Sequence, residues 1–463
     1  MKLNTKCYTS PADLHTPVGI YLKMRDIFRE TCLLESTDHQ NSSQSKSIIC
    51  INPIAGVEIT DLEKGELKLP LQEVIEFKIN KNPNQILDDF RNSFDIEKEE
   101  NDHVIAQSLF GYTAYDSVQF FEDLKFKNDC PLPLMRYRLY QYVIVIDNFT
   151  DQIHLYENRI QGVKSETSRI QAILRNRDFP LFPFKADKEE KSNLTDQAFE
   201  DIVKKGIEHG LRGDVFQLVL SRKFEQRFIG DDFQVYRALR NINPSPYLFY
   251  FDYSDYRIFG SSPESQMIVD NGKATIHPIA GTFKRTGDLI EDAKEAERLK
   301  HDAKENAEHT MLVDLARNDL SKFCENVTVS KLKEIKYFSH VIHMVSEVEG
   351  EISKTNNPFE VIAATFPQGT LSGAPKHKAI QLIDQYENSS RGFYGGSIGY
   401  VGLNGNVNTA IMIRTFLSKN NTLQYQAGAG VVVKSNPQNE REEVSNKLGA
   451  LRKAIELAEK ISL

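Results

Sequence analysis

Several glutamates lie where acidic side chains are unusual, on the apolar side of predicted helices. In a helix predicted over 291–320, apolar residues three, four and seven positions after Glu308 share its side of the helix. These residues are Met311, Leu312 and Leu315. Turning a carboxylate toward a core is costly unless the group is paired or binds a metal. Glu308 is therefore predicted either to pair with a nearby base or to act as a metal ligand.

The last predicted helix, PQNEREEVSNKLGALRKAIELAEK (437–460), places two more glutamates beside an apolar stripe. Its buried positions are expected to be Val444, Leu448, Leu451 and Ile455. Glu440 and Glu443 run alongside this stripe, followed by Lys447. Glu443 and Lys447 form either an ordinary helical ion pair, worth about 0.3–0.5 kcal/mol, or the border of a site. If Glu308 and Glu443 face each other, their hard oxygen atoms favour Mg2+ that retains several waters.

The stretch FPQGTLSGAPKHKAIQLID (366–384) combines glycines, hydroxyls and lysines immediately before an amphipathic helix. A helix entrance with exposed N–H groups attracts anions. The spacing excludes a Walker A nucleotide loop, because only three residues separate Gly369 from Gly373 and Ala374-Pro375 follows. Two interpretations stay open: a site for a smaller anion such as a carboxylate, or a structural turn that caps the helix with Pro375 in its first turn.

Other candidate ligands lie in predicted strands. Arg414, in IMIRT, alternates with Ile411 and Ile413 and is expected on the opposite sheet face, as a bidentate carboxylate clamp or as a solvated residue. The glycines of AGAGVVV (427–433) allow close approach of a ligand or mark a bulge. His343 has apolar neighbours in SHVIHMVSEVEG, so a core role and a catalytic role both stay open.

Composition indicates a soluble globular protein with neither a nucleic-acid partner nor a membrane span. The 463 residues are 40% hydrophobic and 26% charged, with a net charge of −8 and no dense block of Lys and Arg. No stretch approaches the roughly 18 apolar residues of a membrane span, and the start lacks the apolar core of a signal peptide. Five scattered cysteines without a C-x-x-C pair are consistent with free thiols in a reducing cytoplasm.

Apolar runs and turn signals predict an α+β fold with largely antiparallel sheets. A polar, charged linker at 184–194 is expected to join an N-terminal region, 1–183, to a second region, 195–463. Thr195 is the expected N-cap of the helix that opens the second region. The last strands are expected to form a meander, with Asn404-Gly405 as a hairpin turn.

Six motifs follow one another in a specific order over roughly residues 194–460. They are HPIAGTFKRTG, LVDLARNDL, FPQGTLSGAPKHKAIQLI, GFYGGSIGYVG, IMIRT and QAGAGVVVKSNPQNEREEVSNK. Together they resemble the chorismate-utilising enzymes, and within that family the branch formed by the large components of anthranilate synthases. The resemblance implies a four-layer α/β/β/α sandwich of two largely antiparallel sheets between helices, with an active site in a cleft between subdomains. It also implies that the anion is chorismate, a dicarboxylate.

The resemblance assigns roles to the residues at matching positions. Glu308 and Glu443 would bind Mg2+, with Glu440 nearby. Glu264, in FGSSPES, would be the general acid that protonates a departing hydroxide, and His343 would remove the ring proton during aromatisation. The positions that would contact the two carboxylate ends of the substrate are Gly369, Thr370, Tyr394, Arg414, Gly428, Ala429, Gly430 and Lys447.

Two positions distinguish the expected reaction from those of related enzymes. Gln217 would be catalytic where isochorismate and salicylate synthases use a lysine to activate water, and a neutral amide is adequate for ammonia. Ala280 stands where many aminodeoxychorismate synthases have a lysine nucleophile. Both differences favour Mg2+-dependent conversion of chorismate and ammonia to anthranilate and pyruvate. Aminodeoxychorismate synthase, isochorismate synthase and a catalytically silent, tryptophan-binding subunit are the alternatives.

The resemblance also implies a partner and an inhibitor. Ammonia would come from a separate glutamine amidotransferase subunit, since Cys324 lacks the flanking glycines of a nucleophile turn. CLLES (32–36) and NPSPYLF (243–249) resemble the two halves of the family's tryptophan pocket. The residues of that pocket would be Glu35, Ser36, Pro244, Tyr247 and Leu248. A tryptophan-inhibited hetero-oligomer in the cytoplasm is therefore expected.

Overall fold

Strands from the two ends of the chain pair with one another across a long sequence separation. The computed structural model describes residues 1–36, 45–96, 104–337, 341–352 and 357–461. The first elements are β1 (Lys2–Pro11), α1 (Pro17–Arg25), β2 (Cys32–Glu35), β3 (Lys46–Ile59), β4 (Lys64–Lys68), β5 (Ile75–Lys78), α2 (Pro83–Asn92), β6 (Asp95–Ile96), β7 (Ser108–Thr113), the 3-10 helix η3 (Tyr115–Phe120), β8 (Met135–Asp147), β9 (Gln152–Arg159), α3 (Thr167–Arg175) and β10 (Phe184–Ser192).

The remaining elements alternate between helices and short groups of strands. They are α4 (Asp196–Leu211), β11 (Gln217–Gly230), α5 (Phe233–Ile242), β12 (Tyr247–Asp252), β13 (Tyr256–Ser262), β14 (Ser265–Asp270), β15 (Lys273–Ile276), β16 (Ile279–Lys284), α6 (Leu289–His301), α7 (Ala303–Leu320), β17 (Cys324–Tyr337), β18 (Val341–Ile352), α8 (Pro358–Thr365), α9 (Gly369–Ser372), β19 (Gly373–Ala374), α10 (Lys376–Tyr386), β20 (Ser397–Gly402), β21 (Val407–Ile411), β22 (Thr415–Lys419), β23 (Thr422–Val431) and α11 (Pro437–Ile461). In none of the described ranges is a helix long and apolar enough to cross a membrane.

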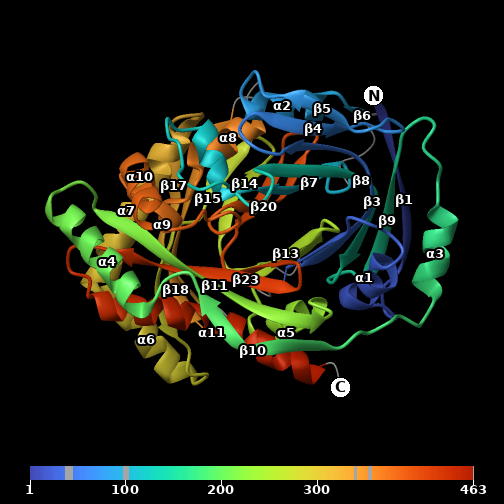
Figure 1. Ribbon diagram of the computed structural model, residues 1–463. Coiled ribbons are helices and arrows are strands. Elements are labelled where there is room, and N and C mark those ends of the chain that lie inside the picture. The colour runs from blue at the N-terminus through green and yellow to red at the C-terminus, as the bar shows by residue number, and fades with distance from the viewer. Residues whose placement is uncertain (37–44, 97–103, 338–340, 353–356, 462–463) are drawn as a thin grey trace.

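Antiparallel pairing continues from strand to strand across both regions (Figure 1). The order β10–β11–β23–β22–β13–β12–β2 leads through β3, β8 and β7 to β20, and then through β21, β14 and β15 to β18. Among the described strands, only β1 and β6 pair in parallel. The predicted α+β class with a large antiparallel sheet is confirmed. Because the pairing is continuous, it does not divide the strands into two sheets, and the four-layer sandwich stays a prediction.

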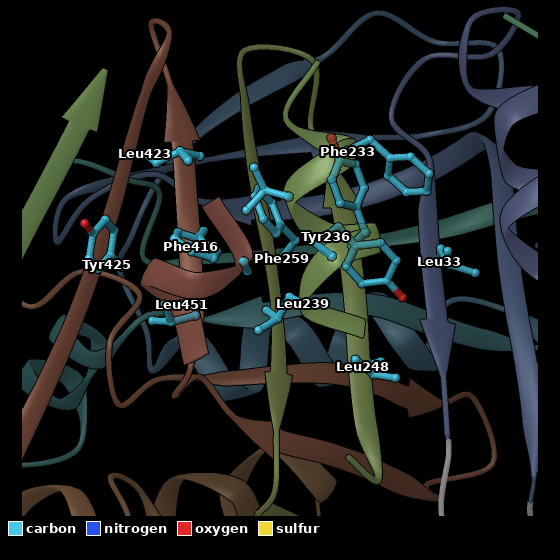
Figure 2. Close-up of a cluster of buried hydrophobic side chains, with 14 of the residues drawn as sticks. Leu33, Phe233, Tyr236, Leu239, Leu248, Phe259, Phe416, Leu423, Tyr425 and Leu451 are labelled. Carbon is cyan, nitrogen blue, oxygen red and sulfur yellow. The ribbon is translucent and has the colours of Figure 1, made fainter. Parts of the chain in front are cut away.

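The main core lies between the β12–β13–β22–β23 strands and the helices α5 and α11. In Figure 2, Leu451 of α11 and Leu239 of α5 lie with Phe259 and Phe416 of neighbouring strands in one buried cluster. The four residues predicted as the buried stripe of the last helix are all buried there. Burying one such aliphatic or aromatic side chain stabilises the fold by roughly 1.5–3 kcal/mol, so this helix is firmly held against the sheet.

Local signals in the sequence are confirmed at two element boundaries. The Oγ1 of Thr195 accepts a 3.2 Å hydrogen bond from the N–H of Ala198 and so caps α4. Asn404-Gly405 forms the turn between β20 and β21, where Gly405 has a φ of 94° that glycine adopts without strain.

Three expectations about elements need correction. The single helix predicted over 291–320 is two helices, α6 and α7, because the side chain of Asp302 accepts a 2.9 Å hydrogen bond from the N–H of Glu305 and starts a new helix. The expected linker at 184–194 is largely the strand β10, which pairs with β11. Arg414 is not a strand residue: β21 ends at Ile411, and Arg414 has a φ of 49° in the bend before β22.

Candidate active site

A cavity of about 160 Å³ opens where the β13–β14 turn, β18 and α11 meet. Its lining combines three residues predicted for the active site, His343, Arg414 and Lys447, with Pro244, which was predicted for the tryptophan pocket. The lining residues are Asn243, Pro244, Ser245, Pro246, Pro263, Val341, His343, Arg414, Asn446, Lys447 and Ala450. The fold therefore brings His343, Arg414 and Lys447, from three distant segments, to a single cavity.

Glu264 lies beside this cavity, in the short turn between β13 and β14. Its Oε1 accepts a 3.1 Å hydrogen bond from Oγ1 of Thr370. Burial raises the pKa of Glu264 to about 7, although the Thr370 hydrogen bond and the positive charges of Lys447 and Arg414 act in the opposite direction. A carboxyl group with this pKa is protonated in a large fraction of molecules near neutral pH, as a general acid must be.

Thr370 reaches Glu264 from α9, a helix of one turn that packs directly against α7. A Cβ placed on Gly369 would lie 2.0 Å from Cδ2 of Leu315, so only glycine allows this contact. Leu315 follows Glu308 by two turns of α7. The close approach at Gly369 thus sets the distance between Thr370 and the acidic residues of α7.

Gln217, the first residue of β11, lies between β23 and α7. Its Nε2 donates a 3.2 Å hydrogen bond to Oε1 of Glu308. A Cβ on Gly430 would lie 2.6 Å from this same Nε2, so the bare backbone of Gly430 leaves the space that Gln217 occupies. The Oε1 of Gln217 is buried and has no hydrogen-bond partner, so a donor group of a ligand could be accepted there.

Acidic side chains of α7 and α11 face one another at the edge of the site. Burial raises the pKa of Glu305, and the carboxylates of Glu308 and Glu443 raise it further. Burial also raises the pKa of Glu440, with a further contribution from Glu443. These couplings link Glu305 to both Glu308 and Glu443, and Glu440 to Glu443, while the predicted sharing of one metal ion by Glu308 and Glu443 stays a prediction. Glu305 was missed, although its offset of three residues from Glu308 puts both on one helix face.

Two of these carboxylates, Glu443 and Glu308, have partners other than one another. Glu443 forms a 2.8 Å ion pair with Lys447, and Glu308 accepts the hydrogen bond from Gln217. Within the described ranges, no three His, Cys, Asp or Glu side chains are arranged to hold a metal ion together. The hard oxygen atoms and the mutual repulsion of these carboxylates nevertheless fit a divalent cation such as Mg2+.

Tyr394 and Lys447 converge on the backbone of Gly428 in β23. The Nζ of Lys447 donates a 2.9 Å hydrogen bond to the carbonyl oxygen of Gly428. A Cβ on Gly428 would lie 2.9 Å from the hydroxyl oxygen of Tyr394, and burial raises the pKa of this tyrosine. Ala429 is the exception among the predicted contacts, since its side chain is part of the main core. Successive strand residues alternate faces, so only the backbone of Ala429 can contribute to the site.

His343 and Arg414 occupy neighbouring places in the cavity wall. The Nδ1 of His343 lies 2.7 Å from the carbonyl oxygen of Gly281, to which it donates. Burial lowers the pKa of His343, and the positive charge of Arg414 lowers it further. The Nη1 of Arg414 donates a 3.4 Å hydrogen bond to Oδ1 of Asn243. His343 is therefore a neutral imidazole near pH 7, which suits a proton acceptor.

The entrance of α10 has a structural role. The Nζ of Lys376, at the start of α10, donates to Oδ2 of Asp319 at 2.7 Å and to the carbonyl oxygen of Thr365 at 3.2 Å, all in buried surroundings. The ammonium group of Lys376 therefore bonds to α7 and to α8. Of the two interpretations of this motif, the structural one fits the start of α10. The preceding short helix, α9, contributes Gly369 and Thr370 to the site.

The two proposed halves of an inhibitor pocket are paired strands. β2 and β12 are antiparallel neighbours in which Glu35 lies opposite Leu248. The buried carboxylate of Glu35 accepts a 2.7 Å hydrogen bond from the hydroxyl of Tyr236 and bonds of 2.9–3.0 Å from Arg240.

The other predicted pocket residues differ in their surroundings. Leu248 is buried in the main core, and Ser36 and Tyr247 are partly exposed. Pro244 lines the cavity that also contains Arg414. The strands carrying the two motifs are therefore neighbours, and one of the motifs reaches the candidate active site.

Comparison with known proteins places the chain in a family. A family model described as chorismate binding enzyme matches residues 30–453. The anthranilate synthase component 1 of Aquifex aeolicus (strain VF5) is 38% identical, covering 96% of this chain and 93% of that protein. The corresponding component of Bacillus subtilis (strain 168) is 34% identical, covering 97% and 92%.

Solved structures agree with this relationship. The crystal structure of anthranilate synthase component I from Streptococcus pneumoniae TIGR4 superposes with a TM-score of 0.77 at 30% identity, covering 96% of this chain and 99% of that chain. MenF, the menaquinone-specific isochorismate synthase from Escherichia coli, shares the fold with a TM-score of 0.75 at 17% identity, covering 98% and 94%.

The chain belongs to the chorismate binding enzyme family, in the branch that contains the anthranilate synthase components 1. The match begins at residue 30, so the likeness extends well beyond the motifs at roughly 194–460.

Proposed function

We propose that this chain is the catalytic component of an anthranilate synthase, converting chorismate and ammonia to anthranilate and pyruvate. The relatives named above support this assignment. The observation that carries it is Glu264, a partly buried carboxyl with a pKa raised to about 7 beside a cavity that holds His343, Arg414 and Lys447. An acid, a base and two cations at one cavity suit a dicarboxylate that must lose a hydroxyl group and a proton.

Glu264 is the proposed general acid. Ammonia adds to ring carbon 2 while the hydroxyl group leaves carbon 4, and hydroxide is a poor leaving group unless it receives a proton. The raised pKa keeps that proton on Glu264 near neutral pH. Thr370 orients the carboxyl group by its hydrogen bond to Oε1.

His343 is the proposed base of the second step, in which the proton on carbon 2 is removed as pyruvate leaves. Its Nδ1–H is donated to Gly281, so the neutral ring carries its basic lone pair on Nε2. Arg414, Tyr394 and Lys447 are the proposed holders of the substrate carboxylates, since a guanidinium group can bind a carboxylate in bidentate fashion.

Mg2+ is the proposed cofactor, held by Glu308 and Glu443 with Glu305 and Glu440 close by. When bound, it would neutralise the ring carboxylate of the substrate and fix its orientation. Burial and the neighbouring carboxylates raise the pKa values of Glu305 and Glu440, and this repulsion between acidic groups supports a cation at this edge.

Gln217 is proposed to lie beside the incoming ammonia, which needs no activating lysine. Ammonia would come from a separate glutamine amidotransferase subunit in a cytoplasmic hetero-oligomer, and tryptophan would inhibit at the β2–β12 pair. Ala280 at the position of a lysine nucleophile disfavours aminodeoxychorismate synthase, and Gln217 disfavours isochorismate synthase.

The test is product identification with the purified chain. Chorismate, Mg2+ and ammonium should yield fluorescent anthranilate with one pyruvate for each turnover. Glutamine should replace ammonium only after a glutamine amidotransferase subunit is added. Aminodeoxychorismate without pyruvate, or isochorismate formed without ammonium, would show that the assignment is wrong.

A further inference from the structure

A fully buried ion pair lies directly behind the candidate site. The side chains of Arg391 and Glu387 are 1% and 4% exposed, and they are joined by bonds of 2.6 Å from Nη2 to Oε1 and 2.9 Å from Nε to Oε2. Glu387 is the residue that ends α10. A pair removed this completely from water needs further hydrogen bonds to be tolerated, so the remaining partners show what it holds.

Glu387 connects the pair to the sheet. Its Oε1 accepts a 2.8 Å hydrogen bond from the N–H of Ser221 and a 2.7 Å bond from the Oγ of the same residue. Ser221 lies in β11 directly opposite Gly428 of β23. Gly428 is the residue on which Tyr394 and Lys447 converge. The carboxylate therefore anchors α10 behind the point where these two proposed substrate contacts meet.

Arg391 connects the pair to the turn that carries Thr370. Its Nη1 donates a 2.6 Å hydrogen bond to the carbonyl oxygen of Leu371, the residue after Thr370, and its Nη2 donates a 2.8 Å bond to the carbonyl oxygen of Val219. Its guanidinium carbon also lies 5.6 Å from the ring centre of Tyr394. One side chain thus contacts α9, β11 and the ring of Tyr394. In Figure 1, α9 and α10 are neighbours beside one end of β11.

We propose that Arg391 and Glu387 are a positioning pair that sets Thr370 and Tyr394 relative to Gly428, and hence to the substrate. This inference rests on the function proposed above for the same site. The planar guanidinium group makes three divergent sets of bonds at fixed angles, to Glu387, to Leu371 and to Val219. A lysine has the same charge but lacks the planar arrangement of several N–H donors, so it cannot keep all three contacts.

The experiment compares Arg391→Lys with Arg91→Lys. Arg91 makes the same kinds of contact elsewhere, a 2.7 Å ion pair with Asp88 and a 2.6 Å bond to the carbonyl oxygen of Leu403. Arg391→Lys should raise the KM for chorismate about tenfold and leave the KM for ammonium within about twofold. Arg91→Lys should lower the melting temperature without changing either KM.

The pH dependence of kcat/KM is a second measurement, and a general loss of stability does not change it. When the carbonyl of Leu371 is released, the bond from Thr370 to Glu264 weakens, and this bond lowers the pKa of Glu264. The basic limb of kcat/KM should therefore move upward by about half a pH unit in Arg391→Lys. Arg91→Lys should keep the parental profile.

The outcomes distinguish a failure of the proposed function from a failure of the positioning role alone. If the parent makes no anthranilate from chorismate and ammonium, the proposed function is wrong. If the parent is active and Arg391→Lys keeps both the parental chorismate KM and the parental pH profile, the positioning role is wrong. If Arg391→Lys does not fold, Glu387→Gln tests the positioning role instead, because glutamine keeps the shape of the glutamate side chain and removes its charge. The same two kinetic changes are then expected, and parental kinetics would overturn the proposal.

Discussion

Thr370 and Glu264, 106 residues apart in the chain, are joined by a 3.1 Å hydrogen bond from Oγ1 to Oε1. The bond favours the ionised form of Glu264, whereas burial favours the protonated form and raises the pKa of the carboxyl group to about 7. The hydroxyl group of Thr370 and the burial of Glu264 together set a pKa near neutrality. Glu264 is therefore a protonated acid at one pH and a carboxylate at a slightly higher pH.

Replacing Thr370 by alanine should raise the pKa of Glu264 above about 7, because a bond to the carboxylate is lost. The protonated acid then persists to higher pH, and the basic limb of the kcat/KM profile should shift upward, with a lower maximum. Thr310→Ala is the control, since Thr310 is exposed and bonds only within α7 through the carbonyl oxygen of Asn306. An unchanged limb in Thr370→Ala would contradict this account.

Glu264→Gln should stabilise the fold above pH 7 while abolishing the acid. A folded pKa raised from 4.5 to about 7 costs stability as pH rises, because the unfolded chain ionises first. The cost is absent below about pH 4.5, grows up to about pH 7 and then stays near 3 kcal/mol. Urea unfolding should show the variant more stable than the parent at pH 8, with a smaller difference at pH 4. Equal pH dependence would rule out a raised pKa.

Glu308→Gln should weaken Mg2+ binding and turnover by about 10–100-fold. The amide keeps an oxygen for the bond from Gln217 and removes only charge. Mg2+ should raise the melting temperature of the parent but not of this variant, which measures binding without turnover. Glu442→Gln, an exposed neighbour of Glu443, serves as the matched control. Parental Mg2+ stabilisation in Glu308→Gln would refute the metal site.

Gly430→Ala should displace Gln217 rather than unfold the protein, because the new Cβ would lie 2.6 Å from the end of that flexible side chain. The KM for ammonium should rise about tenfold, with little loss of stability. Gly449→Ala is the control: nothing lies within 4 Å of the new Cβ, and α11 should gain about 0.5–1 kcal/mol. Steady-state kinetics and urea unfolding measure both effects. Parental ammonium KM in Gly430→Ala would exclude the role of Gln217.

Tryptophan should inhibit the parent and spare Ser36→Phe. Ser36 follows directly after Glu35, whose carboxylate is held by Tyr236 and Arg240 of α5, so a bulky ring there would fill the space beside the β2–β12 pair. Inhibition curves with saturating chorismate and ammonium measure the effect, and activity without tryptophan is the internal control. Equal inhibition of both proteins would place the inhibitor elsewhere.

Local patterns in the sequence were sufficient to predict features that depend only on residues close together in the chain. The cap at Thr195 and the buried stripe from Val444 to Ile455 follow from hydrogen-bonding groups and helical periodicity within a few residues. The break at Asp302 was missed because the polar residues around it suit one helix as well as two. Motif order identified the family, and the comparisons confirm it.

Relations between distant segments were decided only by the tertiary structure. The sequence alone determined which residues could act as acids, bases and cations. It did not show that Glu305 joins Glu308 and Glu443, that Gly369 packs on Leu315, or that Arg391 lies behind Tyr394. Burial and the charges of neighbouring groups, which set the pKa of Glu264, arise only when separate strands and helices close around one cavity.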